Sequence, residues 1–166
     1  YNGDMAVPGA GLNLGGDATQ VTVSGSDGKF EFSVNSGGNY NLALSKTAES
    51  PANQGVTTLD ISLIRRQILG IEPLASPFKP IAADVNDSGS VTTLDITLMR
   101  RVILGMTNTF PAGLWKLVRS DFVFANPQAP WTFEGTRTYS NLTNDVAGQD
   151  FIAIKLGDVN GSWTLP

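Results

Sequence analysis

The sequence has no cysteine and no histidine in its 166 residues. Without cysteine the protein has no thiol nucleophile and no thiolate ligand for zinc. Without histidine it lacks the side chain that most often transfers protons in enzymes. Carboxylates, hydroxyls and lysines are the groups that remain for catalysis. We therefore expect a protein that is not an enzyme.

Basic residues and long apolar runs are also scarce. Acidic residues outnumber basic ones by 15 to 11 and the formal net charge is −4, whereas proteins that bind nucleic acid usually carry a basic stripe. No apolar run approaches the length of about 20 residues that crosses a bilayer as a helix. The sequence therefore predicts neither a nucleic-acid partner nor a membrane span, and two bound calcium ions would balance its net charge.

A polar segment of twelve residues, DVNDSGSVTTLD, occupies positions 84–95. Oxygen-bearing side chains stand at its positions 1, 3, 5 and 12 and a glycine stands at position 6, the pattern of an EF-hand-like loop. Calcium takes six to eight oxygens at about 2.3–2.6 Å, and Gly89 tolerates the positive φ that the turn requires. We predict as calcium ligands the side chains of Asp84, Asn86, Ser88 and Asp95 and the backbone carbonyl of Ser90.

The alternative is an ordinary polar turn before a helix that Thr92 or Thr93 caps, because Asp, Asn, Ser and Gly are common in turns. The agreement between the ligand spacing and the position of the glycine favours the ion.

An internal repeat is the second feature of the sequence. Residues 57–71, TTLDISLIRRQILGI, recur as residues 92–106, TTLDITLMRRVILGM, so the two copies begin 35 positions apart. Each copy has apolar residues at helical spacing and ends in a glycine that stops a helix. We expect two amphipathic helices that pack face to face through Ile61, Ile64, Ile68, Leu69, Ile96, Met99, Ile103 and Leu104.

A loop of the form DxNxSGxVTTxD, then a helix with a basic pair, then a second copy, resembles the dockerin type I module of bacterial extracellular proteins. The resemblance covers residues 49–106. It implies a protein-binding face for a cohesin-like partner, made of Thr58, Leu59, Arg65, Arg66, Thr93, Leu94, Arg100 and Arg101. The alternative for the arginine pairs is a solvated helix face.

The first calcium loop of that family is incomplete in this sequence. When Asp60 is aligned with Asp95, Glu49, Pro51 and Asn53 stand where the early ligands should be, and proline has no side chain that can bind a metal.

The tail contains the missing pattern, because residues 157–162 read GDVNGS, the usual start of such a loop. We predict a second, split calcium site formed by Asp158 and Asn160 with Asn53 and Asp60. An ordinary Asx turn is the alternative.

The first 46 residues are typical of β-structure, with alternating apolar residues in three runs (Val21 and Val23; Phe30, Phe32 and Val34; Tyr40, Leu42 and Leu44) and a hairpin signal at Asp27-Gly28. The stretch from Val7 to Lys46 resembles the carboxypeptidase-regulatory-like domain, a β-sandwich of immunoglobulin type. That family opens with a strand for which only residues 1–5 are available. A missing strand would leave an open edge that can accept another strand.

The region after the repeat is again β-rich, with strands expected at 115–118, 122–124, 131–133, 136–140 and 151–156. The predicted class is mainly β with a helical pair (α+β). The predicted domains are a truncated immunoglobulin-like sandwich at 1–46, a dockerin-like duplicated calcium loop-helix unit at 47–106, and a β-rich tail at 107–166 that packs back and ends in a calcium half-loop.

Three functional hypotheses follow. The combination of parts resembles C-terminal regions of surface and secreted proteins of Bacteroidetes-type bacteria, which implies an extracellular or cell-surface structural or adhesive module that assembles head-to-tail into a filament by strand exchange between copies. The alternative is an adaptor for a cohesin-like domain. The weakest is a carbohydrate-active enzyme that pairs Glu134 with Asp121 or Asp145. A glycan partner also stays open, because an exposed pair among Trp115, Trp131 and Trp163 would suit a sugar.

Overall fold

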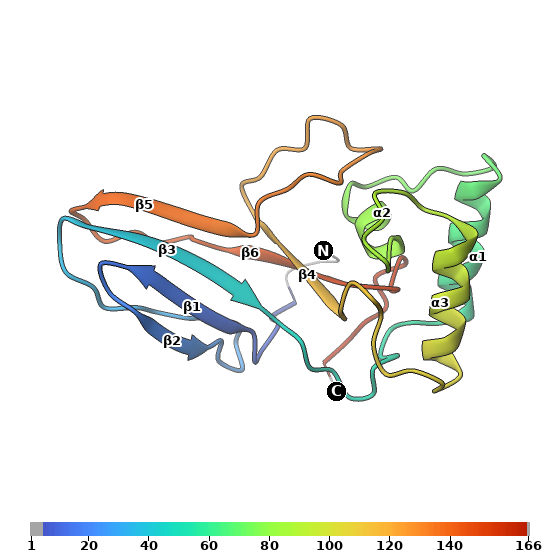
Figure 1. Cartoon of the computed structure of the whole chain (residues 1–166), viewed down its shortest axis with the longest axis horizontal. Coiled ribbons are helices and arrows are strands. Elements are labelled where there is room, and N and C mark those ends of the chain that lie inside the picture. Colours follow the sequence, from blue (N-terminus) through green and yellow to red (C-terminus); the bar gives the residue numbers. More distant parts are fainter. Residues whose placement is uncertain (1–4, 166) are drawn as a thin grey trace.

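The computed structural model describes residues 5–165, which form six strands and three helices. Figure 1 shows the strands gathered at one end of the molecule and the helices at the other, with β4 and β6 between them. Strand pairs are antiparallel throughout the described residues. The predicted α+β class agrees with this arrangement.

The larger sheet has four strands in the order β2 (Gln20–Val23), β1 (Gly11–Gly16), β3 (Gly38–Ser45) and β5 (Thr136–Leu142). Along β1 and β3 every second side chain is buried, because alternate residues of a strand point to opposite faces. These inward side chains form one hydrophobic core, made of Leu12, Leu14, Tyr40 and Leu42.

A strand from the C-terminal region completes this sheet. β5 pairs with β3, with Tyr40 opposite Tyr139 and Leu42 opposite Arg137, and Phe151 packs against the same core. The sheet is therefore built from both ends of the chain. The domain division at 1–46, 47–106 and 107–166 and the immunoglobulin-type sandwich stay predictions.

The run at residues 29–35 differs from its prediction, because it joins neither sheet in the described chain. Phe30, Phe32 and Val34 are still half-buried against the core of the larger sheet. The chain turns at Gly28, whose N–H donates to the Gly25 carbonyl at 2.9 Å, but no hairpin ladder follows. The prediction of a short opening strand concerns residues 1–5, of which 1–4 lie outside the described residues.

Helices α1 (Thr58–Ile68) and α3 (Thr93–Ile103) confirm the two predicted helices. Each begins after a threonine, Thr57 or Thr92, that forms a capping box with the aspartate three residues later, so two otherwise unpaired donors are satisfied. Each also ends before a glycine with φ of 68°, a conformation that other residues rarely adopt.

The two helices pack against each other through their buried faces. Ile64 and Met99 are fully buried, and Ile61 and Ile96 each have 5% of their surface exposed. The prediction was wrong for Ile68, Leu69 and Leu104, which are exposed. These two leucines are the C-cap residues, beyond the last full turn that faces the partner helix.

A third helix, α2 (Phe78–Ala83), was not predicted. It lies between the two copies of the repeat, and Pro80, Ile81, Ala82 and Ala83 are buried. The Ala82 carbonyl accepts a hydrogen bond of 2.8 Å from the Gly157 N–H, which joins this helix to the tail.

The smaller sheet pairs β4 (Trp115–Arg119) with β6 (Phe151–Lys155), in agreement with two of the predicted tail strands. The strands expected at 122–124 and 131–133 are wrong, because both segments are irregular. Their aromatic rings pack together instead, as for Phe122 and Phe124 with centroids 5.1 Å apart. Ring burial therefore produced the alternation that resembles strands.

The main hydrophobic core joins the helices to the tail. It combines side chains from α1, α2 and α3 with Trp115 and Val118 of β4 and with Ile154 of β6. Leu156, Val159 and Trp163, which follow β6, belong to it as well. In residues 5–165 no helix is both long and apolar enough to span a membrane.

Candidate calcium-binding sites

The first half of loop 84–95 is held by the carboxylate of Asp84. Its Oδ1 accepts a hydrogen bond of 2.9 Å from the Ser88 N–H, and its Oδ2 accepts one of 2.7 Å from the Gly89 N–H. The Asn86 side-chain oxygen also accepts from the Ser88 N–H, at 3.2 Å. The structure therefore brings the three predicted early ligands together on one turn.

Asp95 closes the loop from the first turn of α3. Its Oδ2 caps the helix by accepting hydrogen bonds from the Thr92 N–H at 2.9 Å and the Thr92 hydroxyl at 3.0 Å. Its Oδ1 is buried and has no hydrogen-bond partner. Burial raises the pKa of the Asp95 carboxyl above its usual value, and the charge of Asp84 raises it further. A buried carboxylate oxygen of this kind needs a cation or a proton.

These oxygens fit a calcium ion. Two carboxylates, a side-chain amide, the Ser88 hydroxyl and the Ser90 carbonyl are hard oxygen donors, which calcium prefers. The Ser88 hydroxyl lies 3.2 Å from the Ser90 carbonyl oxygen, so the fifth and seventh loop positions are neighbours. In residues 5–165 no three His, Cys, Asp or Glu side chains converge as a metal cluster. Neutral oxygens would have to complete this site.

The tail places a second group of oxygens beside Asp60. The Asn160 N–H donates to the Asp60 Oδ1 at 3.0 Å, although the two residues lie a hundred positions apart. Asp60 and Asp158 have 0% and 1% of their surface exposed. Burial raises the pKa of the Asp158 carboxyl, and the charge of Asp60 adds to this shift.

The structure does not place the Asn53 side chain among these oxygens by any hydrogen bond, although its backbone carbonyl accepts from the Val56 N–H at 2.8 Å. Ser162 and Gly55, which sequence reasoning missed, are in the cluster. The Ser162 hydroxyl donates to the Gly55 carbonyl at 3.1 Å. Spacing could have found both, because Ser162 is the fifth residue of its half-loop and Gly55 is five residues before Asp60.

A buried lysine ties the tail to the segment before α1. The Lys155 ammonium has almost no exposed surface, donates to the Ala52 carbonyl at 2.8 Å and lies 5.7 Å from the centroid of the Trp115 ring. Burial lowers the pKa of Lys155 to about 8. The tail is therefore fixed at its polar end as well as by its apolar residues.

Residues from the C-terminal region also cover loop 84–95. Lys116 forms an ion pair of 2.7 Å with Asp87, and a side chain at Gly89 would meet the Trp131 ring at 3.8 Å. Trp131 is half-buried, whereas Trp115 and Trp163 are buried, so the described chain has no pair of exposed tryptophans that would suit a sugar.

The predicted partner-binding residues lie on the exposed surface of α1 and α3. Leu59 and Leu94 occupy equivalent positions in the first turns and are 56% and 54% exposed. Arg66 differs from its counterpart in the other copy, because it forms an ion pair of 2.7 Å with Glu72. All eight predicted residues are exposed: Thr58, Leu59, Arg65, Arg66, Thr93, Leu94, Arg100 and Arg101.

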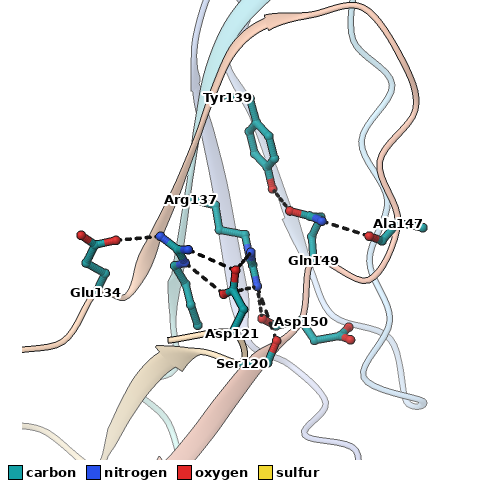
Figure 2. Close-up of polar contacts among 9 residues, drawn as sticks. Ser120, Asp121, Glu134, Arg137, Tyr139, Ala147, Gln149 and Asp150 are labelled. Carbon is teal, nitrogen blue, oxygen red and sulfur yellow. Dashed lines mark hydrogen bonds and ion pairs between the residues drawn. The ribbon is translucent and has the colours of Figure 1, made fainter. Parts of the chain in front are cut away.

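A cluster of ion pairs connects the two sheets (Figure 2). Arg137 of β5 is buried, pairs with Asp121 at 3.0 Å and donates to the Asp150 carbonyl at 2.8 Å. Arg119 of β4 pairs with the same aspartate at 3.1 Å and with Glu134 at 2.7 Å. The cluster therefore joins β4, β5 and the start of β6.

The same cluster bears on the hypothesis of a catalytic carboxylate pair. Hydrogen bonds from Arg119 hold the pKa of the Asp121 carboxyl down to about 2, whereas a glycosidase needs one carboxyl with a raised pKa. Glu134 is paired with the same arginine. Asp121 and Glu134 therefore take part in ion pairs with arginines of β4 and β5.

The comparisons with known proteins bear on the helical part alone. The family model for the dockerin type I domain matches residues 52–104. No curated protein and no solved structure matches the chain. Dockerin domains are non-catalytic modules of extracellular or cell-surface proteins, they bind calcium in EF-hand-like loops, and they bind cohesin partners. The match ends far before the tail, so it includes Asp60 and loop 84–95 but neither Asp158 nor Asn160.

Proposed function

We propose that the protein is a calcium-stabilised docking module of an extracellular or cell-surface protein, and that the paired helices α1 and α3 bind a cohesin-like domain. The exposure of Leu59 and Leu94 on equivalent first turns supports this proposal most directly. Large apolar side chains at the same place in two copies of a repeat offer a partner two equivalent contacts.

Charge complements this apolar centre. Arg65, Arg66, Arg100 and Arg101 are exposed in the last turns of the same helices. Arginine favours bidentate contacts with carboxylates, so the partner is expected to present an acidic patch around an apolar pocket. Because Arg66 is already paired with Glu72, the second copy has the freer pair.

Asp84, Asn86, Ser88 and Asp95, with the Ser90 carbonyl, would hold the calcium ion of loop 84–95. Bound calcium would compensate the charges of the two buried carboxylates and connect the loop to the first turn of α3. Since Leu94 directly precedes Asp95, the same turn carries a metal ligand and a partner contact. We therefore expect docking to require calcium.

The test is binding of purified cohesin-type domains to the immobilised chain in calcium. We expect Leu59→Asp alone and Leu94→Asp alone to weaken binding less than tenfold, because each leaves one copy intact, and the double variant to lose binding. The matched control is Val21→Asp with Val23→Asp, which places the same charges on exposed valines of β2. Binding that survives the double helix variant, or that is lost in the control, would contradict the proposed face.

One observation favours a second candidate, self-association by strand addition. Residues 29–35 join no sheet among the described residues, yet their alternate side chains pack against the core. A strand from another copy could pair with this edge. Light scattering of the purified chain with and without chelator separates the candidates, because large calcium-dependent assemblies support self-association and a calcium-bound monomer supports the adaptor.

A further inference from the structure

The tail segment 158–163 has the same hydrogen bonds as the first half of loop 84–95. The Ser162 N–H donates to the Asp158 Oδ1 and to the Asn160 side-chain oxygen, both at 2.9 Å. In the contiguous loop the Ser88 N–H donates to the equivalent aspartate and asparagine at 2.9 and 3.2 Å. Positions 1, 3 and 5 therefore have the same arrangement in both places.

The correspondence continues at position 6. The Trp163 N–H donates to the second oxygen of Asp158 at 2.9 Å, as the Gly89 N–H donates to the second oxygen of Asp84 at 2.7 Å. At position 4 the backbone of both segments has a positive φ, 71° at Gly161 and 60° at Asp87.

The two halves of the divided loop meet where the contiguous loop continues without a break. The Ser162 hydroxyl donates to the Gly55 carbonyl at 3.1 Å, as the Ser88 hydroxyl donates to the Ser90 carbonyl at 3.2 Å. Gly55 is five residues before Asp60, and Ser90 is five residues before Asp95. A Cβ on Gly55 would lie 2.8 Å from the Cα of Trp163. The close approach of the two segments therefore depends on a glycine.

The charges at this junction are not balanced by the protein. Asp60 and Asp158 are both buried, and the structure shows no ion pair for either within residues 5–165. The buried Lys155 ammonium interacts more strongly with the charge of Glu49 than with that of Asp158, and it donates to the Ala52 carbonyl. Two buried carboxylates in such surroundings favour a bound cation.

We propose that residues 158–162 and 55–60 form one divided calcium loop, with ligands from the side chains of Asp158, Asn160, Ser162 and Asp60 and from the Gly55 carbonyl. This inference rests on calcium binding in the proposed function, but not on the docking partner. The Ser162 hydroxyl takes the fifth loop position, which the sequence assigned to Asn53, and the Gly55 carbonyl takes the seventh. The ion would fasten the tail to the start of α1, so the helical pair depends on a segment that the dockerin match does not include.

The experiment is a calcium titration of the whole chain by isothermal calorimetry, with Asp158→Asn, Asp84→Asn and the double variant. The two single variants are matched, because each aspartate accepts the same pair of backbone hydrogen bonds. We expect two ions per chain in the parent, one in each single variant and none in the double variant.

The stoichiometries separate the possible failures. Two ions in Asp158→Asn would overturn the divided site. One ion in the parent and none in Asp84→Asn would also overturn it, while leaving calcium binding by loop 84–95 intact. No ion in the parent would overturn calcium binding altogether, including its part in the proposed function. A failure to bind cohesin-type domains changes none of these results.

Asp158→Asn could lose its calcium ion because the tail is released, so a milder pair of variants serves as a control. In Asn160→Ala the Ser162 N–H keeps its bond to Asp158, and Asn86→Ala is the matched variant in the contiguous loop. We expect each to weaken one of the two ions by about tenfold or more. The near-ultraviolet circular dichroism of the Trp115–Trp163 pair, whose centroids lie 5.0 Å apart, should stay unchanged and show that the tail is docked. Unchanged affinity of both ions in Asn160→Ala with a docked tail would contradict the proposal.

Discussion

The contiguous loop 84–95 and the divided cluster at 55–60 and 158–162 have equivalent hydrogen bonds but different connectivity. In the contiguous loop the sixth residue is Gly89, where the backbone turns with φ of 74° toward the next ligand. At the equivalent place in the tail stands Trp163, from which the chain does not need to continue into the loop. On the other half the glycine is Gly55, at position 7, where a Cβ would lie 2.8 Å from the Trp163 backbone. The glycine at position 6 lets the chain turn toward the next ligand, whereas the arrangement of the first ligands depends on the hydrogen bonds that the aspartate at position 1 accepts.

The two sites also differ in the aspartate at position 12. Oδ1 of Asp95 is buried without a hydrogen-bond partner, whereas Oδ1 of Asp60 accepts the Asn160 N–H at 3.0 Å. The divided site therefore has an internal bond that joins its halves without an ion. The contiguous site leaves that oxygen for the ion alone.

The largest expected effect is that of calcium on thermal unfolding. At a hundredfold excess over Kd, each ion that binds the native state alone adds about 2.7 kcal/mol, so two sites should add roughly 5 kcal/mol and one site half of that. The measurement is differential scanning calorimetry in calcium and in excess chelator, with magnesium as the control ion. An unfolding temperature that chelator leaves unchanged would contradict calcium binding at either site.

The junction of the divided site can be tested with a pair of glycines. Gly55 and Gly70 have φ of 74° and 68°, but a Cβ would lie 2.8 Å from the Trp163 backbone at the first and meet nothing within 4 Å at the second. Gly70→Ala should cost about 1 kcal/mol for its backbone conformation, and Gly55→Ala about 3 kcal/mol because overpacking is added. Urea unfolding measures both. Equal losses would show that the two segments do not approach so closely.

The features that could be predicted from the sequence are those with local signals. The repeat TTLD predicted α1 and α3, because capping boxes and the terminal glycines are local signals. The spacing of Asp84, Asn86, Ser88 and Asp95 is also a local signal, and it predicted that these residues lie close together. Such patterns lie within one segment, so they can be recognised in the sequence without knowledge of the fold.

The parts that the sequence did not predict depend on contacts between distant segments. The GDVNGS half-loop predicted that the tail meets residues 53–60, but the prediction did not include Gly55 and Ser162, which touch because β6 leads the tail to the start of α1. The aromatic alternation at 122–124 and 131–133 imitates strands, although these rings pack around Phe124 without a ladder. The strand pattern of residues 29–35 was present, but a strand also requires ladder pairing, and no strand of the described chain forms a ladder with this segment.

The different states of the two position-12 aspartates predict a smaller effect in chelator. Asp60→Asn should destabilise the calcium-free protein by about 2 kcal/mol if its amide faces the Asn160 N–H, because two donors then oppose each other in a buried place. Asp95→Asn should be neutral or stabilise it by about 1 kcal/mol, because an uncompensated charge is removed while the cap on Thr92 can persist. Chemical unfolding in chelator compares the two variants. The same loss in both would show that the sites do not differ in this bond.

The smallest expected effect is the pH dependence of the calcium-free protein. Burial raises the folded-state pKa of the Asp95 carboxyl above its ordinary value of 3.8. Between these two values the folded state binds more protons than the unfolded state, so Asp95 makes the protein more stable as the pH falls from the raised pKa toward 3.8. In chelator the parent should therefore gain stability over this range relative to Asp95→Asn, which cannot take up the proton. The measurement is the difference in unfolding free energy between the two proteins across that range, and a difference that stays constant with pH would show that Asp95 is not buried as a charge. In calcium the order reverses, because protonation of Asp95 then competes with the ion and lower pH should weaken binding.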